Sequence, residues 1–248
     1  MSRPLTLVTG GSRGIGAATA LRLASAGHDL VLGYMSDKDA AEGTAERVRA
    51  AGARCRVVAA DVTDPAGVDE LFDAAAEEGT LTGLVNNAGA TLHLGDLADT
   101  PVEVVRTVID LNLTAAVLCA RRAVLAMSTA RGGRGGVIVN VSSGAATLGS
   151  AHEYVHYAAA KAGVDTLTLG LAQEVAAEGV RVNGVAPGLV RTDIHAGAGD
   201  PGRPERMAPG VPLGRAAEPD EVAAAIVWLL GDECSYVTGA TVRVAGGR

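Results

Sequence analysis

The chain has 248 residues, with 28 acidic and 21 basic side chains and a net charge of −7. This acidic balance disfavours nucleic acid as a partner, because it repels phosphate groups. No apolar run approaches the roughly 20 residues that span a bilayer, and the N-terminus lacks a signal-peptide pattern, so we expect a cytoplasmic protein that does not enter a membrane. Hydrophobic residues make up 48% of the chain but aromatic residues only 2%, which predicts a core of alanine, valine and leucine.

The first predicted element is a short apolar strand that ends in a glycine-rich turn. Leu5–Thr9 is apolar and β-branched, Gly10, Gly14 and Gly16 follow it, and Ala17–Ala26 is an amphipathic stretch. A strand, a tight turn and a helix in this order can bind a phosphate, because glycines permit the turn and the free N–H groups at a helix start attract anions. The alternative is a glycine-rich turn that binds no ligand.

Strand and helix patterns alternate along the rest of the chain. We expect further strands at Asp29–Tyr34, Arg54–Ala60, Gly83–Asn86, Val137–Ser142, Val180–Ala186 and Thr241–Val244. We expect helices at Asp37–Ala51, Pro65–Glu78, Pro101–Met127, Glu153–Ala177 and Pro219–Leu230. The strands are continuous apolar runs, which is typical of a parallel sheet covered on both faces. The sequence therefore predicts an α/β fold with a doubly wound parallel sheet of about seven strands and helices on both faces.

Tyr157 and Lys161 form the pair that best indicates chemistry. On a helix, residues four apart share one face, so an ammonium would lie beside a phenol and favour its ionised form. Such a pair can exchange a proton with a carbonyl or an alcohol, and a nearby serine, Ser142 or Ser143, can hold the same oxygen. Of the 21 basic residues only Lys38 and Lys161 are lysines, which favours a function for Lys161 over a solvated surface role.

Taken together, these motifs resemble the short-chain dehydrogenases/reductases of the classical type over essentially the whole chain. Thr9–Gly16 is similar to the family's cofactor loop, and Asp61-Val62 to its adenine-side contact. Asn86–Gly89 is similar to its N-N-A-G motif, and Pro187–Thr192 to its P-G-x-x-x-T segment. Within the family the chain looks most like the 3-oxoacyl-(acyl carrier protein) reductase and glucose-dehydrogenase-like branches. The resemblance implies a single Rossmann-type domain over residues 1–248.

The resemblance also implies the residues of the site. The catalytic tetrad would be Asn112, Ser143, Tyr157 and Lys161, with Ser142 as an alternative to Ser143 and with no metal. Tyr157 would act as the acid in reduction and the base in oxidation, and Asn112 would position a water for a proton relay. The cofactor would contact Gly10, Ser12, Arg13, Gly14, Ile15, Gly16, Tyr34, Asp61, Val62, Asn87, Ala88, Gly89, Tyr157, Lys161, Pro187, Gly188, Val190 and Thr192.

Arg13 and Tyr34 favour NADP(H) over NAD(H). Enzymes that use NAD usually place an Asp or Glu at the end of the second strand, where it binds the ribose 2′-hydroxyl. Tyr34 takes that place here and the next acid is Asp37, while Arg13 in the glycine loop suits a 2′-phosphate. The alternative is that Arg13 is a surface arginine without a ligand.

We therefore expect an NADP(H)-dependent oxidoreductase that transfers a hydride between the nicotinamide and a small carbonyl or alcohol substrate. The alternatives are an imine reductase, dehydratase-like chemistry, and a non-catalytic regulator that binds NADP. The Gly- and Pro-rich segment 193–215 is expected to be a substrate loop. His152 and His156 are expected to line the substrate mouth with Glu153 and Tyr154, a solvated loop being the alternative.

Two long helices carry more apolar residues than one sheet face requires. Val102 and Ile109 extend along one of them, and Leu167 and Leu169 lie on the other. A helix that is apolar on much of its circumference is buried on more than one side. The family resemblance implies that these helices pair across two-fold axes in a homotetramer, with a dimer or a monomer as alternatives.

Overall fold

The computed structural model describes residues 3–248, in which seven parallel strands form one sheet in the order β3-β2-β1-β4-β5-β6-β7. The strands are β1 (Leu5–Thr9), β2 (Asp29–Tyr34), β3 (Cys55–Ala59), β4 (Leu81–Asn86), β5 (Gly136–Val141), β6 (Val180–Pro187) and β7 (Thr241–Val244). Every pairing between neighbouring strands is parallel. The strand order reverses between β1 and β4, which is where ligands bind in sheets of this kind. The predicted doubly wound α/β fold is confirmed.

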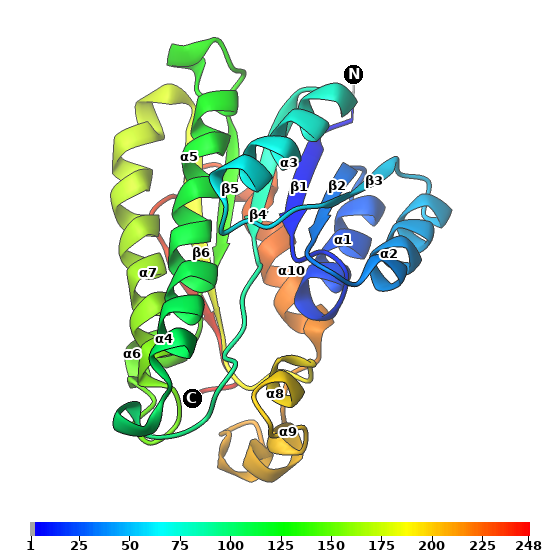
Figure 1. The fold of residues 1–248 in the computed structure, drawn as a ribbon. Coiled ribbons are helices and arrows are strands. Elements are labelled where there is room, and N and C mark those ends of the chain that lie inside the picture. The colour runs from blue at the N-terminus through cyan, green and yellow to red at the C-terminus, as the bar shows by residue number, and fades with distance from the viewer. Residues whose placement is uncertain (1–2) are drawn as a thin grey trace.

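Helices cover both faces of the sheet (Figure 1). They are α1 (Gly14–Ser25), α2 (Lys38–Ala50), α3 (Pro65–Glu78), α4 (Val102–Ile109), α5 (Ala115–Met127), α6 (Ala145–Leu148), α7 (Val155–Val175), α8 (Ile194–Gly197), α9 (Arg203–Met207) and α10 (Pro219–Leu230). The helices α1, α2 and α10 pack on one face, and α3, α5 and α7 on the other. Within the described residues, no helix combines the length and the apolar composition needed to cross a membrane.

The two faces explain why the strands are apolar throughout. Leu7 and Val8 are neighbours in β1, so their side chains point to opposite faces of the sheet, and both are fully buried. Leu7 packs into the cluster formed with α3, α5 and α7, whereas Val8 packs into the cluster formed with α1, α2 and α10. A sheet with only one covered face would instead require alternating apolar and polar residues.

Two predicted elements differ in detail from the structure. The predicted helix Pro101–Met127 is divided into α4 and α5 by a π-helical turn, Asp110–Thr114. The predicted substrate loop contains two short helices, α8 and α9. Sequence patterns cannot report either feature, because a π-turn shifts the backbone by one residue within a continuous helix and because helices of four or five residues show no complete period.

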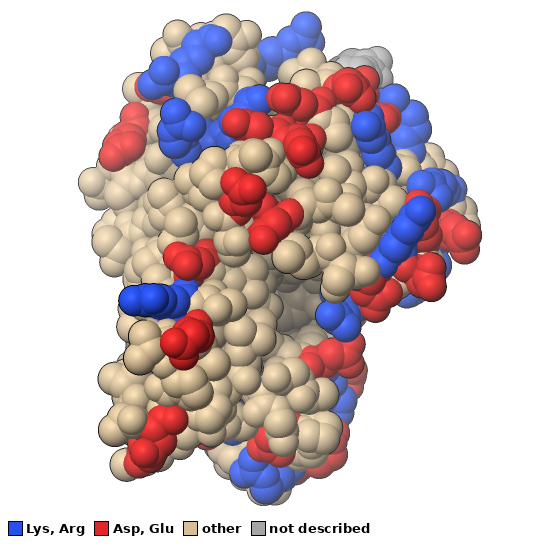
Figure 2. Space-filling model, in the orientation of Figure 1, with Lys and Arg blue, Asp and Glu red and all other residues tan. Residues whose placement is uncertain are grey.

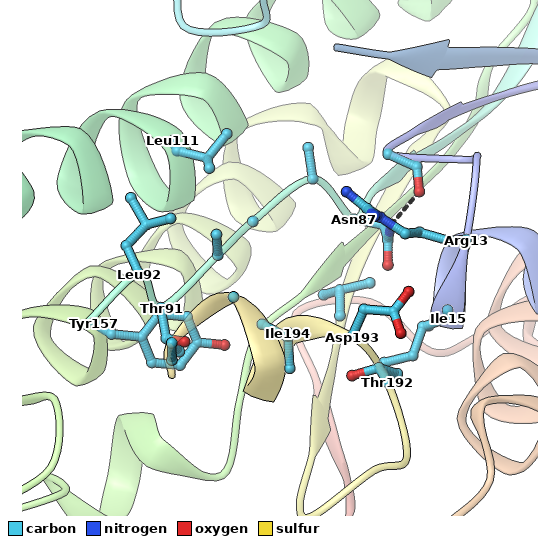
Figure 3. A pocket seen from close by; sticks show the side chains of 18 of the residues that line it. Arg13, Ile15, Asn87, Thr91, Leu92, Leu111, Tyr157, Thr192, Asp193 and Ile194 are labelled. Atoms are coloured by element: carbon cyan, nitrogen blue, oxygen red, sulfur yellow. Dashed lines mark hydrogen bonds between the residues drawn. The ribbon is translucent and has the colours of Figure 1, made fainter. Parts of the chain in front are cut away.

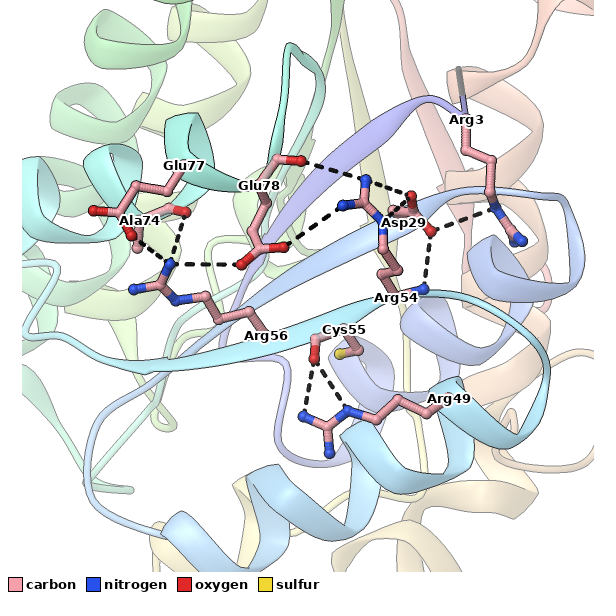
Figure 4. Close-up of polar contacts among 9 residues, drawn as sticks. All are labelled: Arg3, Asp29, Arg49, Arg54, Cys55, Arg56, Ala74, Glu77 and Glu78. Carbon is pink, nitrogen blue, oxygen red and sulfur yellow. Dashed lines mark hydrogen bonds and ion pairs between the residues drawn. The ribbon is translucent and has the colours of Figure 1, made fainter. Parts of the chain in front are cut away.

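Ion pairs hold the sheet at the edge where the strands begin (Figure 4). The carboxylate of Asp29, at the start of β2, is almost fully buried and accepts hydrogen bonds at 2.9 Å from both the backbone N and the Nε atom of Arg54. The Nε atom of Arg3 lies 3.4 Å from the same carboxylate. A buried charge requires such partners. These contacts therefore stabilise the edge of the sheet away from the carboxyl ends of the strands.

Candidate active site

One cleft of about 770 Å³ opens at the carboxyl ends of the strands. Figure 2 shows it as a hollow near the middle of the molecule. All residues of the predicted catalytic tetrad and cofactor contacts line this cleft except Gly16 and Asn112, which lie beside the lining residues Gly10 and Gly89. Motifs that are spread over nearly 200 residues of sequence therefore meet at one edge of the sheet, as expected for a doubly wound fold.

The glycine loop forms one end of the cleft. Gly10 and Gly14 have φ angles of +63° and +54°, which side chains disfavour. A Cβ atom on Gly16 would lie 2.2 Å from the backbone oxygen of Gly10, so only glycine fits there. The loop passes directly into α1, whose first N–H groups are not capped by a side chain, and this arrangement suits a phosphate.

Asn87 locks the glycine loop against the end of β4. Its Nδ2 atom donates to the backbone oxygens of Thr9 and Gly10, both at 3.0 Å. In return, the hydroxyl oxygen of Thr9 accepts hydrogen bonds from the backbone N atoms of Asn87 and Ala88, also at 3.0 Å. The predicted motifs of β1 and β4 therefore hold each other in place through these four hydrogen bonds.

The side of the cleft beneath β2 and β3 holds the residues expected near the adenosine. Asp61 accepts hydrogen bonds from the backbone N and the hydroxyl of Thr63, at 2.9 and 2.7 Å, so its carboxylate shapes the loop. Asp37 caps α2 by accepting from the backbone N of Ala40 at 3.0 Å. Arg13 forms no ion pair with any described residue. A cation that lines the cleft without a protein partner suits an anionic ligand group.

Tyr157, Ser143 and Lys161 meet at the other end of the cleft. The Ser143 hydroxyl lies near that of Tyr157 and acts to lower the pKa of the phenol, and its oxygen also accepts a hydrogen bond from the backbone N of Ala145 at 3.1 Å. The Nζ atom of Lys161 donates to the backbone oxygen of Val141 at 2.8 Å and lies 5.7 Å from the centre of the Tyr157 ring. Ser142, in contrast, turns its hydroxyl away to the backbone oxygen of Lys161 at 3.3 Å. The geometry therefore distinguishes the two serines, and it pairs Ser143 with the tyrosine.

Burial controls the ionisation of this group in the ligand-free protein. It raises the pKa of Tyr157 above its ordinary value, while the neighbouring Ser143 hydroxyl acts in the opposite direction. Burial also lowers the pKa of Lys161 to about 8, opposed by the charge of Asp165. The expectation that Lys161 brings the phenol towards ionisation is thus not met without a ligand, because a buried phenolate loses more hydration than the nearby ammonium returns. Tyr157 is held in its protonated form.

Asn112 lies in the π-helical turn between α4 and α5. Its Nδ2 atom donates to the backbone oxygens of Ala90 and Val108, at 2.8 and 2.9 Å. Its Oδ1 atom is fully buried and has no hydrogen-bond partner among the described residues. A Cβ atom placed on Gly89 would lie 2.5 Å from this oxygen and 3.4 Å from Nζ of Lys161. An acceptor and a donor therefore flank the same point beside the backbone of Gly89.

The loop residues differ from the predictions for the substrate mouth. Tyr154 lines the cleft, but His152 and His156 do not. His152 is exposed and pairs with Asp96 at 2.8 Å, whereas His156 is buried within α7. The prediction was therefore wrong for the two histidines and for Glu153, because His156 is part of the buried α7 and His152 lies on the exposed loop before it.

Sequence reasoning did not single out several residues of the cleft wall, although the last three of them lie in the predicted substrate loop 193–215. They are Thr91, Leu92, Leu111, Ile194, His195 and Arg203, and Figure 3 shows four of them around Tyr157. None belongs to a short motif, and Arg203 is 46 residues from Tyr157 in the sequence, so only the folded chain brings them together. Among the described residues no group of histidine, cysteine or acidic side chains could hold a metal ion.

Comparison with known proteins agrees with this geometry. A family profile described as enoyl-(acyl carrier protein) reductase matches residues 10–248. An uncharacterized oxidoreductase of Escherichia coli is 46% identical and covers 98% of this chain and 99% of its own. The cis-4-hydroxycyclohexanecarboxylate dehydrogenase of Sinomonas cyclohexanicum is 44% identical, covering 98% and 95%.

A solved structure extends the comparison to three dimensions. A short-chain dehydrogenase of Burkholderia cenocepacia, in complex with NADP, is 32% identical and superposes with a TM-score of 0.90 over 99% of this chain and 97% of its own. Sequence, fold and the arrangement of the cleft lead to the same assignment. The chain belongs to the short-chain dehydrogenase/reductase family and is an oxidoreductase.

Proposed function

We propose that the protein is an NADP(H)-dependent carbonyl reductase, and in reverse an alcohol dehydrogenase, with Tyr157 as its general acid and base. The observation that carries this proposal is the placing of the neighbouring Tyr157 and Ser143 side chains at one end of a cleft whose other end is the glycine loop. A proton donor and a dinucleotide-shaped cleft at one sheet edge are what such a reaction needs.

The residues of the cleft suit a nicotinamide dinucleotide. The start of α1 and the loop with Gly10 and Gly14 would hold the pyrophosphate, and Asp61 and Val62 would lie beside the adenine. Asn87, Ala88, Pro187, Gly188 and Thr192 line the path towards Tyr157. When bound, the nicotinamide supplies or accepts the hydride.

The side chains at the Tyr157 end of the cleft would bind the substrate oxygen and transfer a proton to it. Tyr157 and Ser143 would both donate hydrogen bonds to the substrate oxygen, and Tyr157, protonated because of its burial, would pass its proton to that oxygen during reduction. Lys161 would then stabilise the phenolate that Tyr157 becomes. Asn112 offers its unpartnered Oδ1 atom beside Lys161, where a donor such as water would be held for proton return.

Arg13 and Tyr34 support NADP(H) as the cofactor. No carboxylate stands at the end of β2 to accept from a 2′-hydroxyl, and the next one, Asp37, lines the cleft three residues further on and uses one oxygen to cap α2. Arg13 lines the cleft and has no ion-pair partner among the described residues, so a 2′-phosphate would be its natural ligand. The Burkholderia cenocepacia relative, which binds NADP, supports the same choice.

The segment 193–215 supports a small-molecule substrate. It contributes Ile194, His195 and Arg203 to the cleft wall opposite Leu92, and would act as the substrate loop that shields the reaction from water. The cis-4-hydroxycyclohexanecarboxylate dehydrogenase relative suggests a secondary alcohol, or the corresponding ketone, as the substrate class.

The experiment follows the nicotinamide absorbance of the purified protein with a panel of ketones, secondary alcohols and imines. We expect ketone reduction with NADPH, and we expect Tyr157→Phe to lose about 10²–10⁴-fold in kcat, because the variant lacks the proton that general acid catalysis requires. Tyr236→Phe is the matched control, since Tyr236 is fully exposed and distant from the cleft wall. Full turnover by Tyr157→Phe, or turnover of imines alone, contradicts the proposal.

A further inference from the structure

Arg203 is a buried charge in the cleft wall that proton transfer does not use. It is the first residue of α9, its side chain is only 5% exposed, and it lines the same cleft as Tyr157. Burying a guanidinium without hydrogen-bond partners is costly. N–H groups of Arg203 that have no partner in the protein therefore indicate a ligand that would accept from them.

The protein satisfies only one of the three nitrogens of Arg203. Its Nη2 atom donates to Oε1 of Glu153 at 2.7 Å and to the hydroxyl oxygen of Tyr154 at 3.2 Å. Its Nε and Nη1 atoms have no hydrogen-bond partner among residues 3–248, and neither is one of the fully enclosed unpartnered atoms, so both are open to solvent. Three N–H groups of this cleft-lining residue are therefore without a protein partner.

Tyr154 adds a fourth donor at the same place. A guanidinium can only donate, so the hydroxyl oxygen of Tyr154 must accept from Arg203, and its own hydrogen remains free. No acceptor for that hydrogen is found among the described residues. The Tyr154 ring lies 5.3 Å from the Arg203 guanidinium and also packs edge-on against the Tyr157 ring, 5.4 Å between centres. The Tyr154 ring therefore contacts both the Arg203 guanidinium and Tyr157, the proposed proton donor.

The rest of the wall at this end is suited to an aliphatic spacer. Leu92, Leu94, Ile194 and Ala196 line it. The carboxylate of Glu153 is not part of the lining, so a ligand meets the free N–H groups and not the acid that holds them. Both bidentate edges of the guanidinium include Nη2, which Glu153 and Tyr154 occupy, so a ligand would accept single hydrogen bonds from Nε or Nη1 and from the Tyr154 hydroxyl. A carboxylate, with its two oxygens, can accept such charge-assisted and neutral bonds together.

We propose that Arg203 and Tyr154 bind a carboxylate of the substrate, so that the substrates are keto acids and the corresponding hydroxy acids whose reacting carbon is separated from the carboxylate by a short aliphatic chain or ring. This inference rests on the proposed function and adds the class of substrate. Tyr157 acts on the carbonyl, while Arg203 and Tyr154 fix the far end and thereby orient the carbonyl.

The test compares each keto acid with its methyl ester, which keeps the ketone and removes the charge. Levulinate and 4-oxocyclohexanecarboxylate are the probes, each beside its ester, with NADPH saturating. We expect kcat/KM to favour the acid by roughly tenfold or more, mainly through a lower KM, because hydrogen bonds to a charged group add about 1.5–3 kcal/mol and 1.4 kcal/mol is a factor of ten. Equal use of acid and ester, or preference for the ester, overturns the proposal.

Variants assign the preference to the two residues. Tyr154→Phe removes one donor and keeps both ring contacts, so the ratio of acid to ester falls several-fold. Arg203→Met is combined with Glu153→Gln, so that no unpaired carboxylate remains, and the preference disappears. Glu153→Gln alone is the matched control and keeps the preference, because the free donors of Arg203 are unchanged. A preference that survives the double substitution overturns the proposal.

Failure of the proposed function gives a different result. If neither acid nor ester is reduced, thermal unfolding with NADPH still tests the binding site. Levulinate at millimolar concentration then raises Tm of the unmodified protein more than methyl levulinate does, and the difference is lost in Tyr154→Phe. Equal effects of acid and ester on Tm overturn the carboxylate site independently of turnover.

Discussion

The Nζ atom of Lys161 lies 5.7 Å from the centre of the Tyr157 ring, one helical turn further along α7. Both side chains are buried, and burial disfavours the charged form of each. It therefore raises the pKa of Tyr157 and lowers the pKa of Lys161 to about 8. The ligand-free site keeps the phenol proton in place and binds the ammonium proton of Lys161 less tightly than a solvent-exposed lysine does.

The lowered pKa of Lys161 predicts a pH dependence of stability. Between the folded pKa of about 8 and the ordinary value of 10.5, the unfolded chain holds a proton at this position that the folded chain has lost. The free energy of unfolding of the unmodified protein therefore rises with pH in this window. Its rise exceeds that of Lys161→Met by up to roughly 3 kcal/mol. Urea unfolding of both proteins from pH 7 to 10.5 measures the difference.

Tyr157 contributes equally to both proteins in this comparison, so its own titration cancels. Any constant cost of the substitution also cancels, because only the change with pH is read. A difference that stays flat from pH 7 to 10.5 means that Lys161 titrates as a solvated lysine.

Alanine substitutions of the two neighbouring serines are predicted to affect kcat and stability differently. Ser143→Ala removes the hydroxyl beside Tyr157, so kcat for ketone reduction falls by about 10–100-fold, with a small loss of Tm because the same oxygen accepts from the backbone N of Ala145. Ser142→Ala removes a buried hydrogen bond to the backbone of α7 and costs about 0.5–1.5 kcal/mol of stability, with a smaller effect on kcat. Steady-state kinetics and thermal unfolding of both variants separate the roles. A larger loss of kcat in Ser142→Ala contradicts the assignment.

The cofactor preference is predicted to depend on Arg13. We expect a lower KM for NADPH than for NADH, and Arg13→Ala narrows the gap by roughly tenfold, because a charge-assisted bond to the 2′-phosphate is lost. Arg106→Ala changes the net charge equally but lies outside the cleft wall, so it leaves the ratio unchanged. Initial rates with both nucleotides decide the matter, and a preference of the unmodified protein for NADH shows that Arg13 was misinterpreted.

Two helical glycines are predicted to respond in opposite ways to alanine. A Cβ on Gly16 would lie 2.2 Å from the Gly10 oxygen, so Gly16→Ala distorts the phosphate loop, lowers Tm and weakens cofactor binding. A Cβ on Gly43, in α2, meets no described atom within 4 Å, so Gly43→Ala stabilises by about 0.5–1 kcal/mol. Thermal unfolding with and without NADPH tests both. Tight NADPH binding by Gly16→Ala contradicts the packing argument.

Apolar residues on α4, α5 and α7 predict a homotetramer. Val102, Ile109, Val117 and Leu169 remain 59%, 37%, 40% and 52% exposed in the single chain. We expect a mass of four chains by light scattering at micromolar concentration, and Leu169→Glu shifts it to smaller species. Leu97→Glu is the control, since Leu97 is 51% exposed but lies outside these helices. A mass near 24.8 kDa for the unmodified protein contradicts the assembly.

Much of the fold can be read from the sequence because its causes are local. Strands such as Leu5–Thr9 are apolar throughout, since both faces of the sheet are covered, and the glycines after it mark a turn that few other residues permit. The motifs follow the strands in the sequence, and parallel strands end at the same edge, so their meeting in one cleft follows from the order of elements.

The remaining features depend on packing between distant segments. The packing of β5 against α7 decides which of Ser142 and Ser143 faces Tyr157. The raised pKa of Tyr157 depends on how deeply α7 is buried. The pairing of Arg203 with Tyr154 joins residues 49 apart, from two loops without a recognisable pattern. Hydrogen bonds and desolvation act over a few ångströms in space, so only the tertiary structure decided which polar groups were satisfied by the protein and which were left for a ligand.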